Sequence, residues 1–126
     1  MRYLLDSNAL LYLFGAPAEL SAKARKVVRD ENDLSVSVVS FWEIAIKQSI
    51  GKLRFNMTIP QLESLCLERD IQIQELRSNA IERIKTLPRI HGDPFDRILI
   101  AQAQTEGMVI VTCDKTIPRY PVETVW

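Results

Sequence analysis

The segment that most constrains the fold of this chain is HGDPFDRILIAQAQ, residues 91–104. Asp93 precedes a proline, which disfavours helical backbone at Asp93 and suits a helix N-cap, whereas Pro94 suits the first helical position. Beyond Asp96 the predicted helix is apolar on almost every side. A helix of that kind is covered by protein all round, so we expect it inside a layered domain, with Asp96 carried toward the interior.

Short apolar runs alternate with helical patterns along the rest of the chain. Strands are predicted at residues 3–5, 34–36, 71–74 and 108–112, with a short last strand at 122–125. Helices are predicted at residues 9–14, 22–31, 60–70, 78–87 and 94–106. A further helix is predicted to end near residue 50, with either Ser37 or Ser40 as its N-cap. This alternation predicts an α/β fold, a sandwich whose mainly parallel central sheet has four to five short strands between helix layers.

Length and charge limit what the chain can be. It has 126 residues, enough to bury a core, and we expect residues 1–126 to form a single domain. The 16 Lys and Arg side chains offset 16 Asp and Glu side chains, so no excess positive charge attracts nucleic acid to the molecule as a whole. Binding to a polyanion therefore needs a local basic patch or metal ions.

Cysteine usage and hydropathy indicate a compartment. The chain has two cysteines, Cys66 and Cys113, and shows neither a signal-peptide pattern nor an apolar run long enough to span a bilayer. We therefore expect a cytoplasmic protein that makes no membrane contact. Its thiols are expected to stay reduced and to pack as small buried hydrophobic side chains.

Four acidic residues stand in unusually apolar segments, near predicted strand or helix ends. They are Asp6, Glu43, Asp96 and Asp114, with Asp93 as a possible fifth. Asp6 follows the first predicted strand and Asp114 follows the strand at 108–112. Because ligands of open α/β sheets bind outside the carboxyl ends of the strands, we expect these acids to converge there.

Such a group of carboxylates points to metal chemistry. Like charges a few ångströms apart raise one another's pKa, and divalent cations relieve the repulsion. A site made only of oxygen ligands suits Mg²⁺ or Mn²⁺, whereas zinc prefers nitrogen and sulfur. The single histidine, His91, cannot supply a zinc site, and we expect it to be a solvent-facing turn residue with no function. Two cations in a carboxylate cage are a common arrangement for cleaving phosphodiesters.

Each of these features also has a structural interpretation. Asp93 and Asp96 resemble a capping box at a helix N-terminus, where negative charge is favourable. Glu43 could be half of a buried ion pair with a Lys or Arg. The basic cluster that follows it is either a local phosphate-binding edge or an ordinary solvated face, and it consists of Lys47, Lys52 and Arg54.

Four ordered motifs resemble the PIN domain, and in particular the VapC-type toxins of bacterial toxin–antitoxin pairs. They are Asp6-Ser7-Asn8, Ser40-Phe41-Trp42-Glu43, His91-Gly92-Asp93-Pro94-Phe95-Asp96-Arg97 and Val111-Thr112-Cys113-Asp114. The resemblance extends from Arg2 to Trp126. It implies a PIN-like fold, with Mg²⁺ binding and RNA cleavage by Asp6, Glu43, Asp96 and Asp114. It leaves open whether Asp93 ligates metal or only caps. Ser7 stands where relatives often carry Thr, a hydroxyl able to orient the first aspartate or a metal-bound water.

The same resemblance implies partners. The chain resembles the toxin half of a pair, with an RNA substrate and an antitoxin that lies in an apolar groove and sends an Arg or Lys toward the acids. A homodimer is also implied. Candidates for the groove, with ordinary core packing as the alternative, are Phe41, Trp42, Leu53 and Phe55.

Two rival functions fit parts of the pattern. A phospho-receiver domain needs an acidic pair after the first strand and an aspartate ending a middle strand, but Ser7 follows Asp6 and residues 71–76 contain only Glu75. The other rival keeps the fold and gives up catalysis: a PIN-like RNA- or protein-binding module whose acids are structural. Metal binding separates this module from the nuclease.

Overall fold

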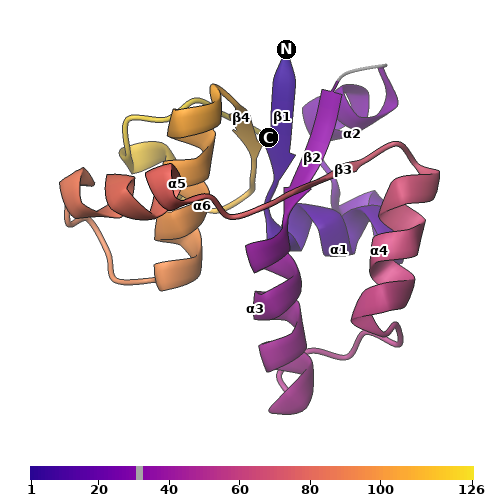
Figure 1. Cartoon of the computed structure of the whole chain (residues 1–126). Coiled ribbons are helices and arrows are strands. Elements are labelled where there is room, and N and C mark those ends of the chain that lie inside the picture. The colour runs from indigo at the N-terminus through magenta and orange to yellow at the C-terminus, as the bar shows by residue number, and fades with distance from the viewer. Residues whose placement is uncertain (31–32) are drawn as a thin grey trace.

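The computed structural model describes residues 1–30 and 33–126, and its centre is a parallel sheet (Figure 1). Within these residues five strands pair in the order β3-β2-β1-β4-β5, and every neighbouring pair is parallel. The strands are β1 (Arg2–Leu5), β2 (Asp33–Ser37), β3 (Gln72–Gln74), β4 (Val109–Val111) and β5 (Thr124–Val125). The predicted fold class is confirmed.

Helices connect the strands close to the predicted places. They are α1 (Ser7–Gly15), α2 (Ala22–Arg29), α3 (Val38–Ser49), α4 (Ile59–Glu68), α5 (Ser78–Arg83) and α6 (Pro94–Glu106). Short 3₁₀ turns occur at Pro17–Glu19, Ile84–Thr86 and Ile117–Arg119. The predicted helix over residues 78–87 therefore changes geometry at Ile84, and the predicted helix end at residue 31 lies outside the described residues. No helix in the described residues has the length and apolar character that crossing a bilayer requires.

Two hydrophobic cores lie on the two faces of the sheet. Leu5 belongs to the core that gathers side chains from α1, α2, α3 and α4, whereas Leu4 belongs to the core that contains α5 and α6. Successive residues of a strand point to opposite faces, so these two leucines anchor one helix layer each. In α6 every residue from Ile98 to Ala103 is buried, which confirms the prediction of an internal helix.

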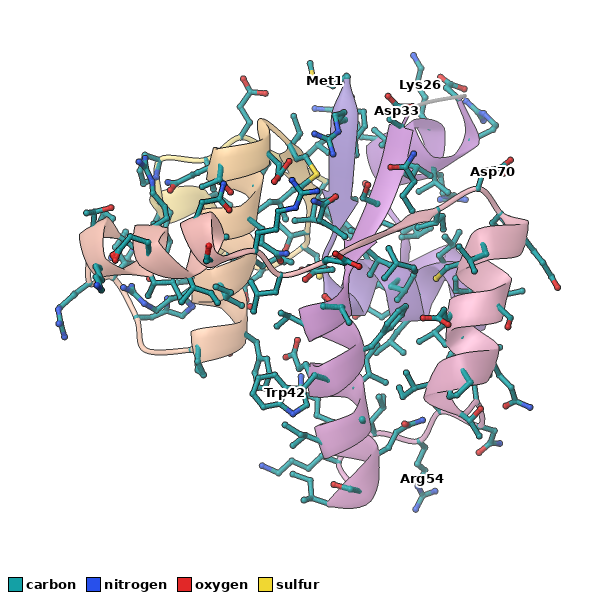
Figure 2. The ribbon with its side chains drawn as sticks, in the orientation of Figure 1. Met1, Lys26, Asp33, Trp42, Arg54 and Asp70 are labelled. Atoms are coloured by element: carbon teal, nitrogen blue, oxygen red, sulfur yellow. The ribbon has the colours of Figure 1, made fainter. Side chains whose placement is uncertain are left out.

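The carboxyl ends of the strands meet at one edge of the sheet. Leu5, the last residue of β1, is in register with Val36 of β2 and Val111 of β4. The chain leaves this edge into α1 and α3, while Met1 and Asp33 lie at the opposite edge (Figures 1 and 2). Residues that directly follow β1, β2 and β4 are therefore brought together.

We expect Gly107→Ala to lower the free energy of unfolding by about 1–2 kcal/mol, the usual cost of left-handed backbone for a residue with a Cβ. Gly107 ends α6 with a φ of +66°, and among the described residues nothing lies within 4 Å of an added Cβ, so backbone strain alone acts. Gly92 is the control, because its added Cβ is equally unobstructed and its φ lies outside that region. Chemical denaturation measures both variants, and equal losses would contradict the explanation.

Candidate active site

Asp6 stands at the end of β1 and begins α1. One carboxylate oxygen accepts a hydrogen bond of 2.8 Å from the backbone N–H of Ala9, which caps the helix, and the Thr112 hydroxyl also donates to this carboxylate. The backbone N–H of Asp6 donates to Val111 at 3.2 Å and so ties the end of β1 to β4. Asp6 is 6% exposed, which makes it one of the few buried charged residues of the molecule.

Burial and neighbouring charge both act on Asp6. Burial raises the pKa of this carboxyl from 3.8 to about 6, even though the hydrogen bonds from Thr112 and Ala9 lower the pKa. The carboxylates of Asp96 and Glu43 raise it further, because they lie close enough to repel the ionised form. The structure therefore brings together three acids that are far apart in the sequence.

Glu43 lies on α3 and is held at both carboxylate oxygens. The Ser7 hydroxyl donates to Oε1 at 2.8 Å, and the Lys47 ammonium lies 3.1 Å from Oε2, one helical turn further along α3. The ion pair is the structural alternative that the sequence left open for Glu43. The hydrogen-bond partner of the Ser7 hydroxyl is thus Glu43 and not Asp6, which precedes Ser7 in the sequence. The assignment of Glu43 as a metal ligand stays a prediction.

Asp93 and Asp96 open α6, and their roles differ. Asp93 is the N-cap, because its Oδ1 accepts hydrogen bonds from the backbone N–H groups of Phe95 and Asp96 at 2.9 and 3.1 Å. Burial raises the pKa of Asp96, and the carboxylates of Asp93 and Asp114 raise it further, while the hydrogen bond to His91 lowers it. Capping by Asp93 is confirmed, and metal ligation by Asp93 stays a prediction.

Asp114 follows β4 and organises the turn after it. Its Oδ1 accepts hydrogen bonds from the backbone N–H groups of Thr116 at 2.6 Å and Ile117 at 3.1 Å. Thr112 links this loop to Asp6, because its hydroxyl accepts from the Asp114 N–H at 3.0 Å while it donates to the Asp6 carboxylate. The sequence offered no separate signal for Thr112, which is a short polar residue inside one of the motifs.

The prediction that His91 is a solvent-facing turn residue is wrong. Its side chain is 23% exposed, with Nε2 3.0 Å from Asp96 Oδ2 and Nδ1 2.7 Å from the Tyr120 hydroxyl. The sequence could not show this contact, because Tyr120 lies 29 residues away, after strand β4. The only available signal was the presence of a single histidine five residues before a candidate ligand.

The predicted site acids thus gather at one end of the sheet. Asp6 is close enough to Glu43 and Asp96 for their charges to repel, and Asp96 is equally close to Asp93 and Asp114. Within residues 1–30 and 33–126, however, no three acidic, histidine or cysteine side chains already stand where they could hold one ion. The carboxylate oxygens engage backbone and side-chain donors instead. The donor set fits Mg²⁺ or Mn²⁺, because it is made of carboxylates without thiolate ligands.

The apolar residues expected to line a partner's groove divide into two kinds. Phe41 is 4% exposed and belongs to the core, so it is no surface candidate, and Leu53 and Phe55 pack half-buried against the same core. Trp42 is 62% exposed. Figure 2 shows Trp42 extending from α3, and its ring packs edge-on against Phe95 of α6 with centroids 5.2 Å apart.

The remaining sequence predictions concern cysteines and basic residues. Cys66 is free and buried as expected, while Cys113 is free but only half-buried. Of the basic cluster after Glu43, Lys52 and Arg54 are exposed, and Lys47 is engaged with the glutamate. This cluster is therefore mostly a solvated face.

Comparison with known proteins identifies the family. Residues 3–123 match the PIN domain. Ribonuclease VapC22 of Mycobacterium tuberculosis (strain ATCC 25618 / H37Rv) is 30% identical over 130 residues, which cover 98% of this chain and 97% of that protein. Solved structures with the same fold include VapBC2 from Rickettsia felis bound to promoter DNA, with a TM-score of 0.73, 15% identity, and coverage of 99% of this chain and 98% of that one.

Two further structures agree in fold. A toxin–antitoxin complex from Klebsiella pneumoniae has a TM-score of 0.66 at 19% identity, covering 98% of this chain and 96% of that one. The sarcin-ricin loop cleaving toxin VapC20 of Mycobacterium tuberculosis has a TM-score of 0.61 at 12% identity, covering 93% of each chain. Because the PIN domain matches residues 3–123, nearly the whole chain, this chain belongs to the PIN domain family.

Proposed function

We propose that this protein is a Mg²⁺-dependent endoribonuclease and the toxin component of a toxin–antitoxin pair. The observation that carries the proposal is the gathering of buried and half-buried acids from separate elements at the carboxyl edge of the sheet. The similarity to ribonuclease VapC22 supports RNA as the substrate. The proposed catalytic residues are Asp6, Glu43, Asp96 and Asp114.

Electrostatics supports a cation at this edge. A pKa of about 6 means that Asp6 is mostly ionised at neutral pH, although burial and two neighbouring carboxylates oppose its charge. A divalent cation removes that opposition, so it would draw the carboxylates together. Asp6, Asp96 and Asp114 are its proposed ligands, with Glu43 and Asp93 as further ones, and Mn²⁺ as a possible replacement for Mg²⁺. When bound, the cation activates water and neutralises charge on the phosphate.

The rest of the site holds these acids in place. Ser7 holds Glu43 at Oε1, and Lys47 balances its charge at Oε2. Thr112 holds Asp6 against the loop that bears Asp114. Because α1, α3 and α6 all begin near this edge, rigid elements fix the backbone positions of these acids, and the carboxylates themselves are left to be drawn together by the cation.

A cleft beside the acids suits an RNA strand. It encloses about 760 Å³, and its polar lining includes Lys85, Arg89, His91 and Arg97. His91 and Arg97 also belong to the α6 end of the site, so the cleft and the acids are contiguous. Local cations at this cleft can attract phosphates even though the chain has a net charge of zero.

We extend the proposal to protein partners. VapBC complexes and a toxin–antitoxin complex share the fold, which supports an antitoxin as the partner of this chain. Exposed Trp42 is the remaining candidate for a contact with that partner or with a second copy in a homodimer.

A second candidate function has one observation in its favour. The Glu43–Lys47 ion pair, together with the lack of a ready ion cage in the described residues, supports a PIN-like RNA- or protein-binding module without catalysis. Calorimetric titration with Mg²⁺ and Mn²⁺ separates the two functions. Binding that is lost in Asp6→Asn favours the nuclease, and no binding favours the module.

We expect Asp6→Asn and Asp96→Asn each to reduce Mg²⁺-dependent RNA cleavage to background, because each removes a ligand charge from the site. Asn retains a cap oxygen at Asp6, so the fold should persist in circular dichroism. Asp33→Asn is the matched control, since Asp33 is an exposed acid at the opposite edge of the sheet (Figure 2). Cleavage of labelled RNA at parental rates by both site variants would overturn the mechanism.

We expect Asp6→Asn to stabilise the protein in chelator at pH 7. The folded state holds the Asp6 proton more tightly than the unfolded chain, with a pKa of about 6 against 3.8, so stability is lost as pH rises through this interval. A shift of about two pKa units corresponds to about 3 kcal/mol, an upper bound on the gain. Denaturation curves should show the gain at pH 7 and its decline toward pH 4. A gain that is independent of pH would contradict this account.

We expect expression of the chain alone to arrest growth of a bacterial host, and co-expression with the protein encoded beside it to restore growth. The physical reason is that RNA cleavage by the free site is stopped when the partner covers the acids. The Asp96→Asn variant is the control and should be harmless when expressed alone at the same level. Growth arrest by that variant would show that toxicity does not come from the proposed chemistry.

A further inference from the structure

A chain of hydrogen bonds runs from Arg97 to Asp96 through two other side chains. Arg97 donates through Nη1 to the Tyr120 hydroxyl at 3.0 Å and to the Pro88 carbonyl at 2.8 Å. The Tyr120 hydroxyl lies 2.7 Å from His91 Nδ1, and His91 Nε2 lies 3.0 Å from Asp96 Oδ2. Tyr120 is 3% exposed, so this chain is anchored in the core.

The donors around Tyr120 fix the tautomer of His91. A phenol has one hydrogen to donate and two lone pairs to accept with. Both lone pairs are used by groups that can only donate, namely the Arg97 guanidinium at 3.0 Å and the His91 backbone N–H at 3.2 Å. The phenol hydrogen is then directed to His91 Nδ1 at 2.7 Å rather than to the His91 carbonyl at 3.4 Å. Nδ1 is therefore an acceptor, and the ring hydrogen resides on Nε2.

The tautomer of His91 determines whether the ring donates a hydrogen bond to Asp96. With its hydrogen on Nε2, the neutral imidazole donates to Oδ2 of Asp96, which as a carboxylate can only accept. Oδ2 of Asp96 is thus held by a hydrogen bond from His91. The first turn of α6 fixes the backbone of Asp96, and the hydrogen bond from His91 restrains the rotation of its carboxylate group.

We propose that His91 is a positioning residue that orients Asp96 for a divalent cation, in the Nε2–H tautomer that Tyr120 and Arg97 impose. The proposal rests on the proposed function and adds a residue to it. Groups that orient metal ligands in this way typically contribute about 10- to 100-fold to metal affinity or activity.

The first test is calorimetric titration of RNA-free protein with Mn²⁺. His91→Ala should weaken affinity by about 10- to 100-fold. His91→Gln places an amide donor near the position of Nε2 and should restore most of the affinity. His91→Asn keeps only a group near Nδ1, facing Tyr120, and should remain weak. The matched pair of amides therefore separates donation to Asp96 from simple filling of the space.

The outcomes distinguish this proposal from the one on which it rests. Parental Mn²⁺ affinity in Asp96→Asn means that the acids do not form the metal site, and the proposed function fails. Lost affinity in Asp96→Asn with parental affinity in His91→Ala overturns the positioning role alone. Equal affinities of the Gln and Asn variants also overturn it. Thermal melts of each variant show whether it is folded.

A second test needs no variant and no metal. The chain contains one histidine, so ¹⁵N-labelled imidazole gives a single, assigned pair of ring-nitrogen signals. At about pH 9, where imidazole is ordinarily neutral, the proposal requires a protonated Nε2 and an unprotonated Nδ1. Tyr120→Phe removes the phenol hydrogen that Nδ1 accepts and should shift the Nδ1 signal, while the Asp96 carboxylate keeps the ring hydrogen on Nε2. A predominant Nδ1–H form in the parental protein would overturn the proposal.

Discussion

Repulsion between carboxylates that the fold gathers at one edge is the constraint on which the site depends. Burial already disfavours the charge of Asp6, and Glu43 and Asp96 add to that cost. A protein that only needed stability would place apolar or neutral side chains there. The sheet instead brings the acids together through the registered ends of β1 and β4. The cost is local, because the two cores on either face of the sheet are apolar and carry the stability of the fold.

Much of this arrangement could be predicted from the sequence because it follows from local rules. Asp93 before a proline predicted the start of α6, and the predicted end at residue 106 is the observed one. Apolar runs followed by an acid predicted that Asp6 and Asp114 stand at strand ends, and right-handed connections between parallel strands then place those ends together. Each inference used residues within a few positions of one another, where periodicity and backbone preferences are informative.

What the sequence could not supply were contacts between distant side chains. Tyr120 reaches His91 only because the turn after β4 folds back over the start of α6, and no periodic pattern encodes that path. The Glu43–Lys47 pair was open to prediction as an i, i+4 contact, yet the sequence could not decide between it and a metal ligand. Phe41 and Trp42 show the same limit: they are adjacent and similar, but one is in the core and the other is exposed.

Capping and chemistry are compatible uses of the same carboxylates, since each carboxylate has two oxygens and a cap needs one. Asp6 and Asp93 each use Oδ1 to receive the first N–H groups of a helix, and Asp114 uses Oδ1 for the turn before Ile117. The other oxygen is left to face neighbouring groups. Helix N-termini also stabilise negative charge, so the geometry that begins the helices offsets part of the repulsion among the neighbouring carboxylates. An acid that starts a helix at the edge of a parallel sheet can thus stabilise the fold with one oxygen, and the proposed cation site requires only the other.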